Sequence, residues 1–336
     1  MPTWRSSKAD CGTCGDRPST ESRTVICVLA GGVGAARLLV GLVSVMPPRE
    51  IVTVINTADD VVLHGLHISP DLDTVTYTLA GAHNTETGWG LAGETWKAMG
   101  ALKRLGGPAW FSLGDRDLGT HMYRTGRLAE GAGLAEVTAE IASSFGLGVH
   151  LLPMTEDRVT TMVTLAKGNR AGVEVGFQEW FVGLGHAVPV TGVRFDGVEV
   201  ACPGPGVLEA IAEAEVVVVA PSNPIVSIGP LLAVPGLADA LRARRDDTVA
   251  VSPIVAGAAL KGPAARLMRD LGHEASVVGV AGLYRDVAAT LVVDTADASL
   301  AGAVEAAGMA CVVTDTVMAD PTVAAALAKT TLEAAR

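Results

Sequence analysis

Aromatic and charged residues are scarce in this sequence. Phe, Trp and Tyr make up 4% of its 336 residues and charged residues 18%, whereas hydrophobic residues reach 49%. The core must therefore consist mainly of Ala, Val, Leu and Ile, a composition typical of layered helices and strands. The length fits either one large α/β domain with insertions or two smaller domains.

Positive charge is also scarce, and this excludes one class of partner. The formal net charge is −11, whereas proteins that bind nucleic acid need clustered Lys and Arg to contact phosphates. A membrane-spanning helix needs about 20 apolar residues, and the longest apolar stretch, 28–46, carries Arg37 at its centre. We therefore expect neither nucleic-acid binding nor a membrane span.

The cysteines lack the spacing of a four-cysteine zinc site. Cys11 and Cys14 form a CxxC pair in the polar stretch 1–24, but no second pair follows, as a structural zinc site would require. The same stretch lacks the apolar run of a secretory signal, and we expect it to be a disordered tail. The other cysteines lie in or beside apolar runs, which predicts buried, reduced thiols in a cytoplasmic protein. These are Cys27, Cys202 and Cys311.

Short runs of β-branched residues alternate with segments of helical length. Uninterrupted apolar strands of this kind are buried on both faces, which predicts a parallel sheet between helices. The predicted strands are 25–30, 51–55, 215–220, 248–252, 276–281 and 310–315. The predicted helices, in which apolar residues recur at intervals of three and four, are 35–45, 94–105, 134–145, 207–214 and 322–335.

Between about 147 and 202 the pattern changes to alternating apolar and polar residues. The turn sequences "KGNRAG" and "DG" interrupt it, and both are typical of antiparallel hairpins. We therefore predict a Rossmann-like, doubly wound α/β fold with a mostly parallel sheet, in which residues 25–336 form a single domain. An antiparallel hairpin lobe is inserted into this domain at about 147–202.

The first predicted strand ends in the glycine-rich stretch "AGGVGAAR". Gly31, Gly32 and Gly34 would form the turn into a helix, where backbone N–H groups and the helix dipole favour a phosphate. The stretch departs from the dinucleotide-binding fingerprint, because Arg37 replaces the third glycine and Asn56 replaces the acidic residue after the second strand. Two interpretations remain, a phosphate-binding loop and a tight structural turn.

Four aspartates follow the second predicted strand and open the next helix. Asp59 lies at the carboxyl end of the strand, where open α/β sheets bind ligands, and Asp73 lies in the first turn of the helix. Two carboxylates on adjacent loops suit Mg²⁺, so we predict Asp59 and Asp73 as its ligands, with Asp60 in reserve. We interpret Asp71 as a helix N-cap.

Three further groups of polar residues have less specific patterns. His64 and His67 suit softer metals than Mg²⁺, and we interpret them as bystanders. The stretch "LGDRDLGTH" at 113–121 forms either a local ion-pair network or part of a site at a helix start. The stretch "PSNP" at 221–224 follows a buried strand and is either an N-cap turn or a rigid loop that contacts a ligand.

Taken in order, these stretches resemble the family of 2-phospho-L-lactate transferases, which includes the actinobacterial phosphoenolpyruvyl transferases and acts in the biosynthesis of coenzyme F-420. The resemblance extends from about Val25 to the C-terminus and rests on motifs in the order of the family. These are "GGVGAARLL", "NTADD", "PDLDT", "LGDRDLGTH", "LLPMTEDR", "FQEWFV", "APSNPIVSIGP" and "SPIVAG".

The resemblance implies transfer of a phospholactyl or phosphoenolpyruvyl group from a guanosine diphospho-acid donor to the ribityl hydroxyl of 7,8-didemethyl-8-hydroxy-5-deazariboflavin, with release of GMP. It implies that Asp59 and Asp73 are catalytic and hold Mg²⁺, with Asp73 also near the acceptor hydroxyl. Ser112 and Trp180 would line the acceptor site, and the protein would be a homodimer. The residues that would bind the donor are Gly31, Gly32, Gly34, Asn56, Ser222, Asn223 and Ser252.

The residues also fit this chemistry independently of the resemblance. Phosphoryl-type transfer needs positioning and charge neutralisation more than covalent catalysis, and in an acidic protein a metal and backbone dipoles supply the local positive field. The main alternative is an NAD(P)-dependent oxidoreductase on a Rossmann fold, which the departures at Arg37 and Asn56 disfavour. A second is a non-catalytic nucleotide sensor. The sequence does not distinguish phospholactate, phosphoenolpyruvate and phosphoglycerate as the transferred acid.

Overall fold

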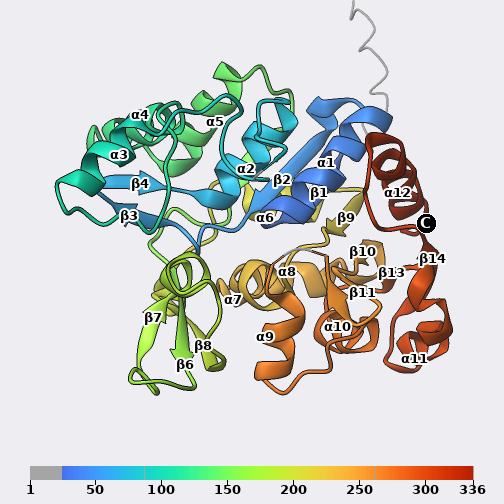
Figure 1. Ribbon diagram of the computed structural model, residues 1–336. Coiled ribbons are helices and arrows are strands. Elements are labelled where there is room, and N and C mark those ends of the chain that lie inside the picture. Colours follow the sequence, from blue (N-terminus) through green and yellow to red (C-terminus); the bar gives the residue numbers. More distant parts are fainter. Residues whose placement is uncertain (1–24, 87, 261, 336) are drawn as a thin grey trace, which may run out of the picture.

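The computed structural model describes residues 25–86, 88–260 and 262–335. They form a seven-stranded parallel sheet with helices on both faces, which confirms the predicted doubly wound α/β fold (Figure 1). In spatial order the strands are β14 (Ala310–Thr314), β13 (Thr290–Asp294), β10 (Thr248–Val251), β9 (Val216–Val219), β1 (Ile26–Ala30), β2 (Ile51–Ile55) and β5 (His150–Pro153). The expected tail 1–24, with its CxxC pair, lies outside the described residues.

The strand order reverses between β1 and β9. From β1 the chain continues to β2 and β5 on one side of the sheet, and it then returns to β9, β10, β13 and β14 on the other side. In open parallel sheets, a crevice forms at such a reversal outside the carboxyl ends of the strands, and ligands bind there. The loops that follow β1 and β9 therefore flank the expected binding position.

Side chains alternate along β1 between two hydrophobic cores. Ile26, Val28 and Ala30 belong to one core, and Cys27 and Leu29 belong to the other. The first core lies under α1 (Val33–Val45), α2 (Pro70–Leu79), α5 (Leu134–Ser144) and α12 (Pro321–Glu333). The second lies under α6 (Val207–Glu213), α7 (Gly229–Ala233), α8 (Leu237–Ala243), α9 (Ala264–Asp270), α10 (Val277–Tyr284) and α11 (Ala301–Ala306).

Two smaller parts extend from the main sheet (Figure 1). One part contains the hairpin of β3 (Val61–Leu63) and β4 (Leu66–Ile68), with α3 (Lys97–Arg104) and α4 (Asp117–Ala129). The other is an antiparallel sheet of β6 (Thr160–Leu165), β7 (Glu174–Gly176) and β8 (Val190–Asp196). A short hairpin of β11 (Ile254–Val255) and β12 (Ala258–Ala259) follows β10.

The segment predicted as the inserted lobe, 147–202, is divided between two sheets. Its first strand, β5, pairs in parallel with β2 and forms an edge of the main sheet. Only β6, β7 and β8 form the separate antiparallel lobe, which packs around the buried Trp180 and Val163. The alternating pattern therefore marks the lobe from Thr160 to Asp196 rather than from 147.

Two expectations for individual segments are wrong. The predicted strand 276–281 lies in helix α10, because the Ser276 hydroxyl accepts hydrogen bonds from the N–H groups of Val278 and Gly279 and so caps the helix. The strand in this part of the sheet is β13, which the apolar pattern did not single out. Cys27 is buried as expected, but Cys202 is exposed.

No single helix among the described residues is long and apolar enough to cross a membrane. One bent pair, Pro224–Ala233 with Leu237–Ala243, reaches the necessary length and composition only when joined across a 92° bend. Side chains of this pair, including Ile228 and Leu231, are buried in the second core.

Helix α1 packs closely against α12 at Gly41. A Cβ atom at Gly41 would lie 2.1 Å from the carbonyl oxygen of Ala324, whereas a Cβ atom at Gly126 in α4 would meet nothing within 4 Å. We expect Gly41→Ala to destabilise the protein by about 1–3 kcal/mol through overpacking. Gly126→Ala should leave it unchanged or stabilise it by up to about 1 kcal/mol. Urea unfolding measures both, and equal effects of the two changes would contradict the close packing.

Candidate active site

A cavity of about 620 Å³ lies at the carboxyl ends of β1, β2 and β9, where the strand order reverses. Its wall combines the glycine turn after β1, the aspartates after β2, the start of α4, the loop after β9 and part of the antiparallel lobe. Predicted site residues that line it are Gly32, Gly34, Asp59, Asp73, Ser112, Ser222, Asn223 and Ser252. Gly31, Asn56 and Trp180 do not line it.

The glycine turn packs directly against the loop after β9. A Cβ atom at Gly34 would lie 2.1 Å from the carbonyl oxygen of Pro221, so only glycine allows this approach. The Gly31 N–H donates to the Ser222 hydroxyl at 3.0 Å, which explains why Gly31 lies behind the cavity wall. Helix α1 begins at Val33, and no side chain of the described residues caps its first turn. The backbone N–H groups of this turn are therefore available to an anion.

Asp59 and Asp71 form a pair of carboxylates on the cavity wall. Asp59 is 6% exposed, and its Oδ1 atom has no hydrogen-bond partner among the described residues. Burial, with repulsion from Asp71, raises the pKa of Asp59 well above its usual range. Burial also raises the pKa of Asp71 to about 6. Such a pair favours a cation, because a cation offsets both the desolvation and the repulsion.

The interpretation of Asp71 as an N-cap is wrong. Ser69 occupies the N-cap position of α2 and Pro70 the first helical position, so Asp71 lies one residue inside the helix. Its Oδ2 atom accepts a hydrogen bond of 3.0 Å from Asn56 Nδ2, and a Cβ atom at Gly32 would lie 2.7 Å from its Oδ1. Asp71 therefore connects the glycine turn to the end of β2, and Asn56 supports it from behind the wall.

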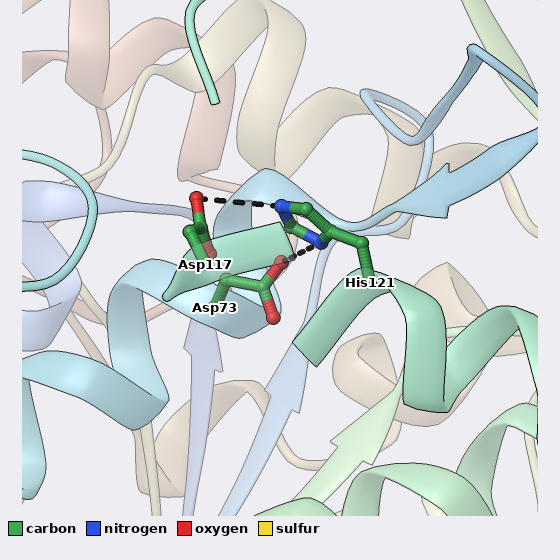
Figure 2. A group of neighbouring side chains, drawn as sticks. All are labelled: Asp73, Asp117 and His121. Carbon is green, nitrogen blue, oxygen red and sulfur yellow. Dashed lines mark ion pairs between the residues drawn. The ribbon is translucent and has the colours of Figure 1, made fainter. Parts of the chain in front are cut away.

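Asp73 takes part in a different, buried network (Figure 2). Arg124 contacts both of its carboxylate oxygens, with Nη1 donating to Oδ2 at 3.2 Å and Nη2 donating to Oδ1. His121 lies between two carboxylates, with Nδ1 3.7 Å from Asp73 Oδ2 and Nε2 3.3 Å from Asp117 Oδ2. The Tyr77 hydroxyl donates to Asp117 Oδ1 at 2.6 Å. Arg124 thus neutralises Asp73, and a metal at Asp73 would have to share the carboxylate with it.

The two aspartates of the stretch "GDRD" have different roles. Asp115 is a capping residue, since its carboxylate accepts from the N–H groups of Lys97 and Ala98 at the start of α3. Asp117 instead lines the cavity. Asp117 therefore contributes to the site, whereas Asp115 caps a helix, and neither aspartate forms an ion pair with Arg116 among the described residues.

The remaining acidic and histidine side chains near the cavity are supporting residues. Asp60 Oδ2 accepts from the Ser69 hydroxyl at 2.6 Å, and burial raises its pKa well above the usual range. Burial, together with the charge of Arg124, lowers the pKa of His67 to about 4. His64 occupies the left-handed backbone region at φ 55° in the turn between β3 and β4. Neither histidine lines the cavity.

The loop after β9 presents an amide group with a fixed orientation. Asn223 Oδ1 accepts from the N–H groups of Ile225 at 3.0 Å and Val226 at 3.4 Å, so the residue caps the short helix Pro224–Ile228. Its Nδ2 atom is buried without a hydrogen-bond partner in the described part of the chain. The predicted cap and the predicted ligand contact are therefore compatible, because each uses a different atom of Asn223.

The lobe contributes aromatic rings to the cavity, but Trp180 is not among them. Trp180 is fully buried, and its Nε1 donates to the carbonyl oxygen of Val188 at 2.8 Å, so the largest ring fills the lobe core. Phe177 and Phe181 line the cavity instead. Their ring centroids are 5.4 Å apart and their planes differ by 7°. Trp180 supports this stack through a contact of 5.9 Å between its centroid and that of Phe177.

Three residues of the site were missed in the sequence. Arg124 and Tyr77 belong to the buried network, and Arg37 lines the cavity. A signal for Arg124 was present, since positions 117, 121 and 124 follow the i, i+4, i+7 spacing of one helix face. In the sequence, Arg37 is conspicuous only as a departure from the dinucleotide-binding fingerprint.

The ion pair of Asp73 and Arg124 is nearly inaccessible to water, with exposures of 5% and 2%. We expect Arg124→Met to destabilise the protein by about 3–5 kcal/mol, because it leaves a buried carboxylate without its partner. The further change Asp73→Asn in the same chain should recover part of this loss. Arg127→Met, three residues later on the same helix and paired only at the surface, should have a much smaller effect. Urea unfolding checks the order, and equal losses at the two arginines would contradict it.

Comparison with known proteins gives the family. Residues 26–331 match the family model described as 2-phospho-L-lactate transferase CofD. The phosphoenolpyruvate transferase of Kitasatospora aureofaciens is 46% identical over 312 residues, which cover 91% of this chain and 96% of that protein. That of Streptomyces griseus is 43% identical over 312 residues, covering 92% and 98%.

A crystal structure of a member of the UPF0052 family from Bacillus halodurans shares the fold. Its TM-score is 0.58 at 17% sequence identity, and the match covers 93% of this chain and 99% of that chain. The match to the family model spans nearly all the described residues, and the two transferases are similar over almost their whole lengths. The chain therefore belongs to the 2-phospho-L-lactate transferase CofD family.

Proposed function

We propose that the protein transfers a phospho-organic-acid group, phospholactyl or phosphoenolpyruvyl, from a guanosine diphospho-acid to the ribityl hydroxyl of a deazaflavin precursor of coenzyme F-420, with release of GMP. The observation that carries this proposal is the composition of the one cavity at the strand reversal. A glycine turn with free helix N–H groups, buried carboxylates and aromatic rings share its wall. Membership of the transferase family supports the same class of reaction.

The donor would bind across the two loops that flank the reversal. The first-turn N–H groups of α1, beside Gly32 and Gly34, suit the diphosphate, because unpaired amides and the helix dipole both favour an anion. The unpaired Nδ2 of Asn223 offers a hydrogen bond to the guanosine. Ser222 and Ser252 also line this part of the wall.

The acceptor would bind toward the lobe. A flat tricyclic ring suits the stacked pair of Phe177 and Phe181, since aromatic rings bury large apolar area at defined geometry. Ser112 lies on the same cavity wall and is exposed, so its hydroxyl is accessible to a polar edge of the ring or to the ribityl chain. Trp180 acts here through Phe177 rather than by direct contact.

The carboxylates fit a Mg²⁺ ion, which prefers oxygen ligands and usually takes one or two carboxylates. Asp59 offers an unpaired buried oxygen and would hold the ion together with Asp73, while Asp71 adds negative charge beside it. When bound, Mg²⁺ neutralises charge on the phosphate oxygens during transfer. Asp73 would also accept a hydrogen bond from the ribityl hydroxyl, and Arg124 holds that carboxylate in place.

In the proposed transfer, the ribityl oxygen forms a bond to the phosphorus that carries the organic acid. The bond from this phosphorus to the oxygen shared with GMP breaks, and GMP leaves with that oxygen and its electron pair. The proton of the hydroxyl is released from the acceptor as the new phosphodiester forms. The chain's part is to hold donor and acceptor in line, which accounts for most of catalysis in phosphoryl transfer.

The metal role predicts that EDTA abolishes transfer and that Mg²⁺ restores it. Without substrates, Mg²⁺ should also raise the midpoint of thermal unfolding, because an ion that binds only the folded protein stabilises it. Asp59→Asn should lose this rise, whereas Asp239→Asn, which removes an exposed carboxylate on α8, should keep it. Full activity in EDTA would refute the metal role.

The function itself is tested by mass spectrometry of the product. The deazaflavin precursor is incubated with guanosine diphospho-lactate, diphospho-enolpyruvate and diphospho-glycerate in separate reactions, and the expected product is the precursor extended by one phospho-acid. The product masses also identify the acid. Tight binding of NADH without any binding of guanine nucleotide would instead support the oxidoreductase alternative.

A further inference from the structure

Among the described residues, those that line the cavity include several carboxylates but few cations. Asp59, Asp71, Asp73 and Asp117 all line it. Arg124, the cation beside Asp73, is engaged with both oxygens of that carboxylate. Among the residues that the structure describes, Arg37 is the only Lys or Arg that lines the cavity.

Arg37 has no hydrogen-bond or ion-pair partner within the described ranges, although these aspartates share the cavity with it. Its side chain is exposed, so the guanidinium is not held by the protein. Three surface arginines elsewhere in the chain, Arg127, Arg194 and Arg242, do pair with carboxylates. An arginine left free in a cavity of aspartates is therefore positioned for something other than a local carboxylate.

The position of Arg37 on α1 indicates which kind of ligand group it would contact. Residues three and four apart share one face of a helix, so Arg37 lies on the same face as Val33 and Gly34, one turn further along. All three line the cavity. The guanidinium and the unpaired first-turn N–H groups thus border the same space, and both attract an anion.

We infer that Arg37 binds the phosphate of the donor that is distal to the guanosine, and that it thereby makes the site prefer a diphosphate over a monophosphate. The inference rests on the proposed function. A planar guanidinium can donate two parallel hydrogen bonds to phosphate oxygens. It also supplies positive charge from the protein itself, in the same cavity as the carboxylates that would hold Mg²⁺. Arg37, which replaces a fingerprint glycine, then has a role that a glycine could not fill.

The test compares binding of GDP and GMP, at constant Mg²⁺, to the wild-type protein and to three variants by isothermal titration calorimetry. Arg37→Gln should weaken GDP binding about 10- to 100-fold, as expected for loss of hydrogen bonds to a charged group, and should weaken GMP binding far less. Arg37→Lys should recover part of the loss, because it restores charge without the planar pair of donors. Arg242→Gln, which removes the same charge at the surface of α8, should bind both nucleotides as the wild type does.

Three outcomes separate the possibilities. If Arg37→Gln binds GDP as tightly as the wild type, the inference is wrong. If it binds GDP normally but loses affinity for the complete guanosine diphospho-acid, Arg37 contacts the carboxylate of the acid, and the assignment to the phosphate is overturned. If the wild-type protein binds no guanine nucleotide, the proposed function fails first. Because Arg37 is exposed, circular dichroism should show the same unfolding midpoint for all variants.

Discussion

The ion pair of Asp73 and Arg124 fixes the geometry on which the site depends. It joins α2, which starts at the carboxyl edge of the sheet, to α4, which belongs to the segment beyond β2. Because both groups are removed from water, neither can move away without exposing the other as an unpaired buried charge. The ion pair also positions three further side chains. His121 contacts Asp73, Asp117 contacts His121, and the Tyr77 hydroxyl donates to Asp117.

The cavity combines carboxylates with groups that attract anions, and this combination follows from the topology. Parallel strands bring their carboxyl ends to one edge, so the aspartates after β2 and the loops after β1 and β9 meet there. Asp59 and Asp71 are shielded enough that their pKa values rise. The glycine turn beside Asp71 offers the α1 amides, and Arg37 lies one turn further along α1. A ligand with negative charge and an attendant cation would complement both kinds of group, whereas a neutral ligand would complement neither.

Much of the fold could be predicted because its signals are local. The buried strands around β1, β2 and β9 are uninterrupted apolar runs, and the glycines after β1 mark a turn where no Cβ atom fits at Gly34. The failures have non-local or competing causes. The apolar run at 276–281 is a helix whose first turn is capped by the Ser276 hydroxyl. Apolar periodicity alone does not separate a buried helix from a buried strand.

The contrast between local and non-local signals also explains which features of the site could be predicted. The positions of Gly32, Gly34, Asp59, Asp73 and Asn223 follow from strand ends, and the structure does bring them to one cavity. Side-chain partners are set by tertiary contacts, which the sequence does not contain. The tie between Asp71 and Asn56, the pairing of Arg124 with Asp73 and the burial of Trp180 all depend on segments far apart in the chain.

The amide of Asn223 gives the cavity wall a fixed chemical polarity. An asparagine side chain can usually rotate its amide by half a turn and exchange its oxygen for its nitrogen. Here rotation would place the NH₂ group against two backbone N–H donors, those of Ile225 and Val226. The buried Nδ2 atom therefore always carries hydrogen atoms, never a lone pair, at this point. The proposed contact with guanosine would need an acceptor such as a ring carbonyl, because an amino group of the same size would leave two donors facing each other.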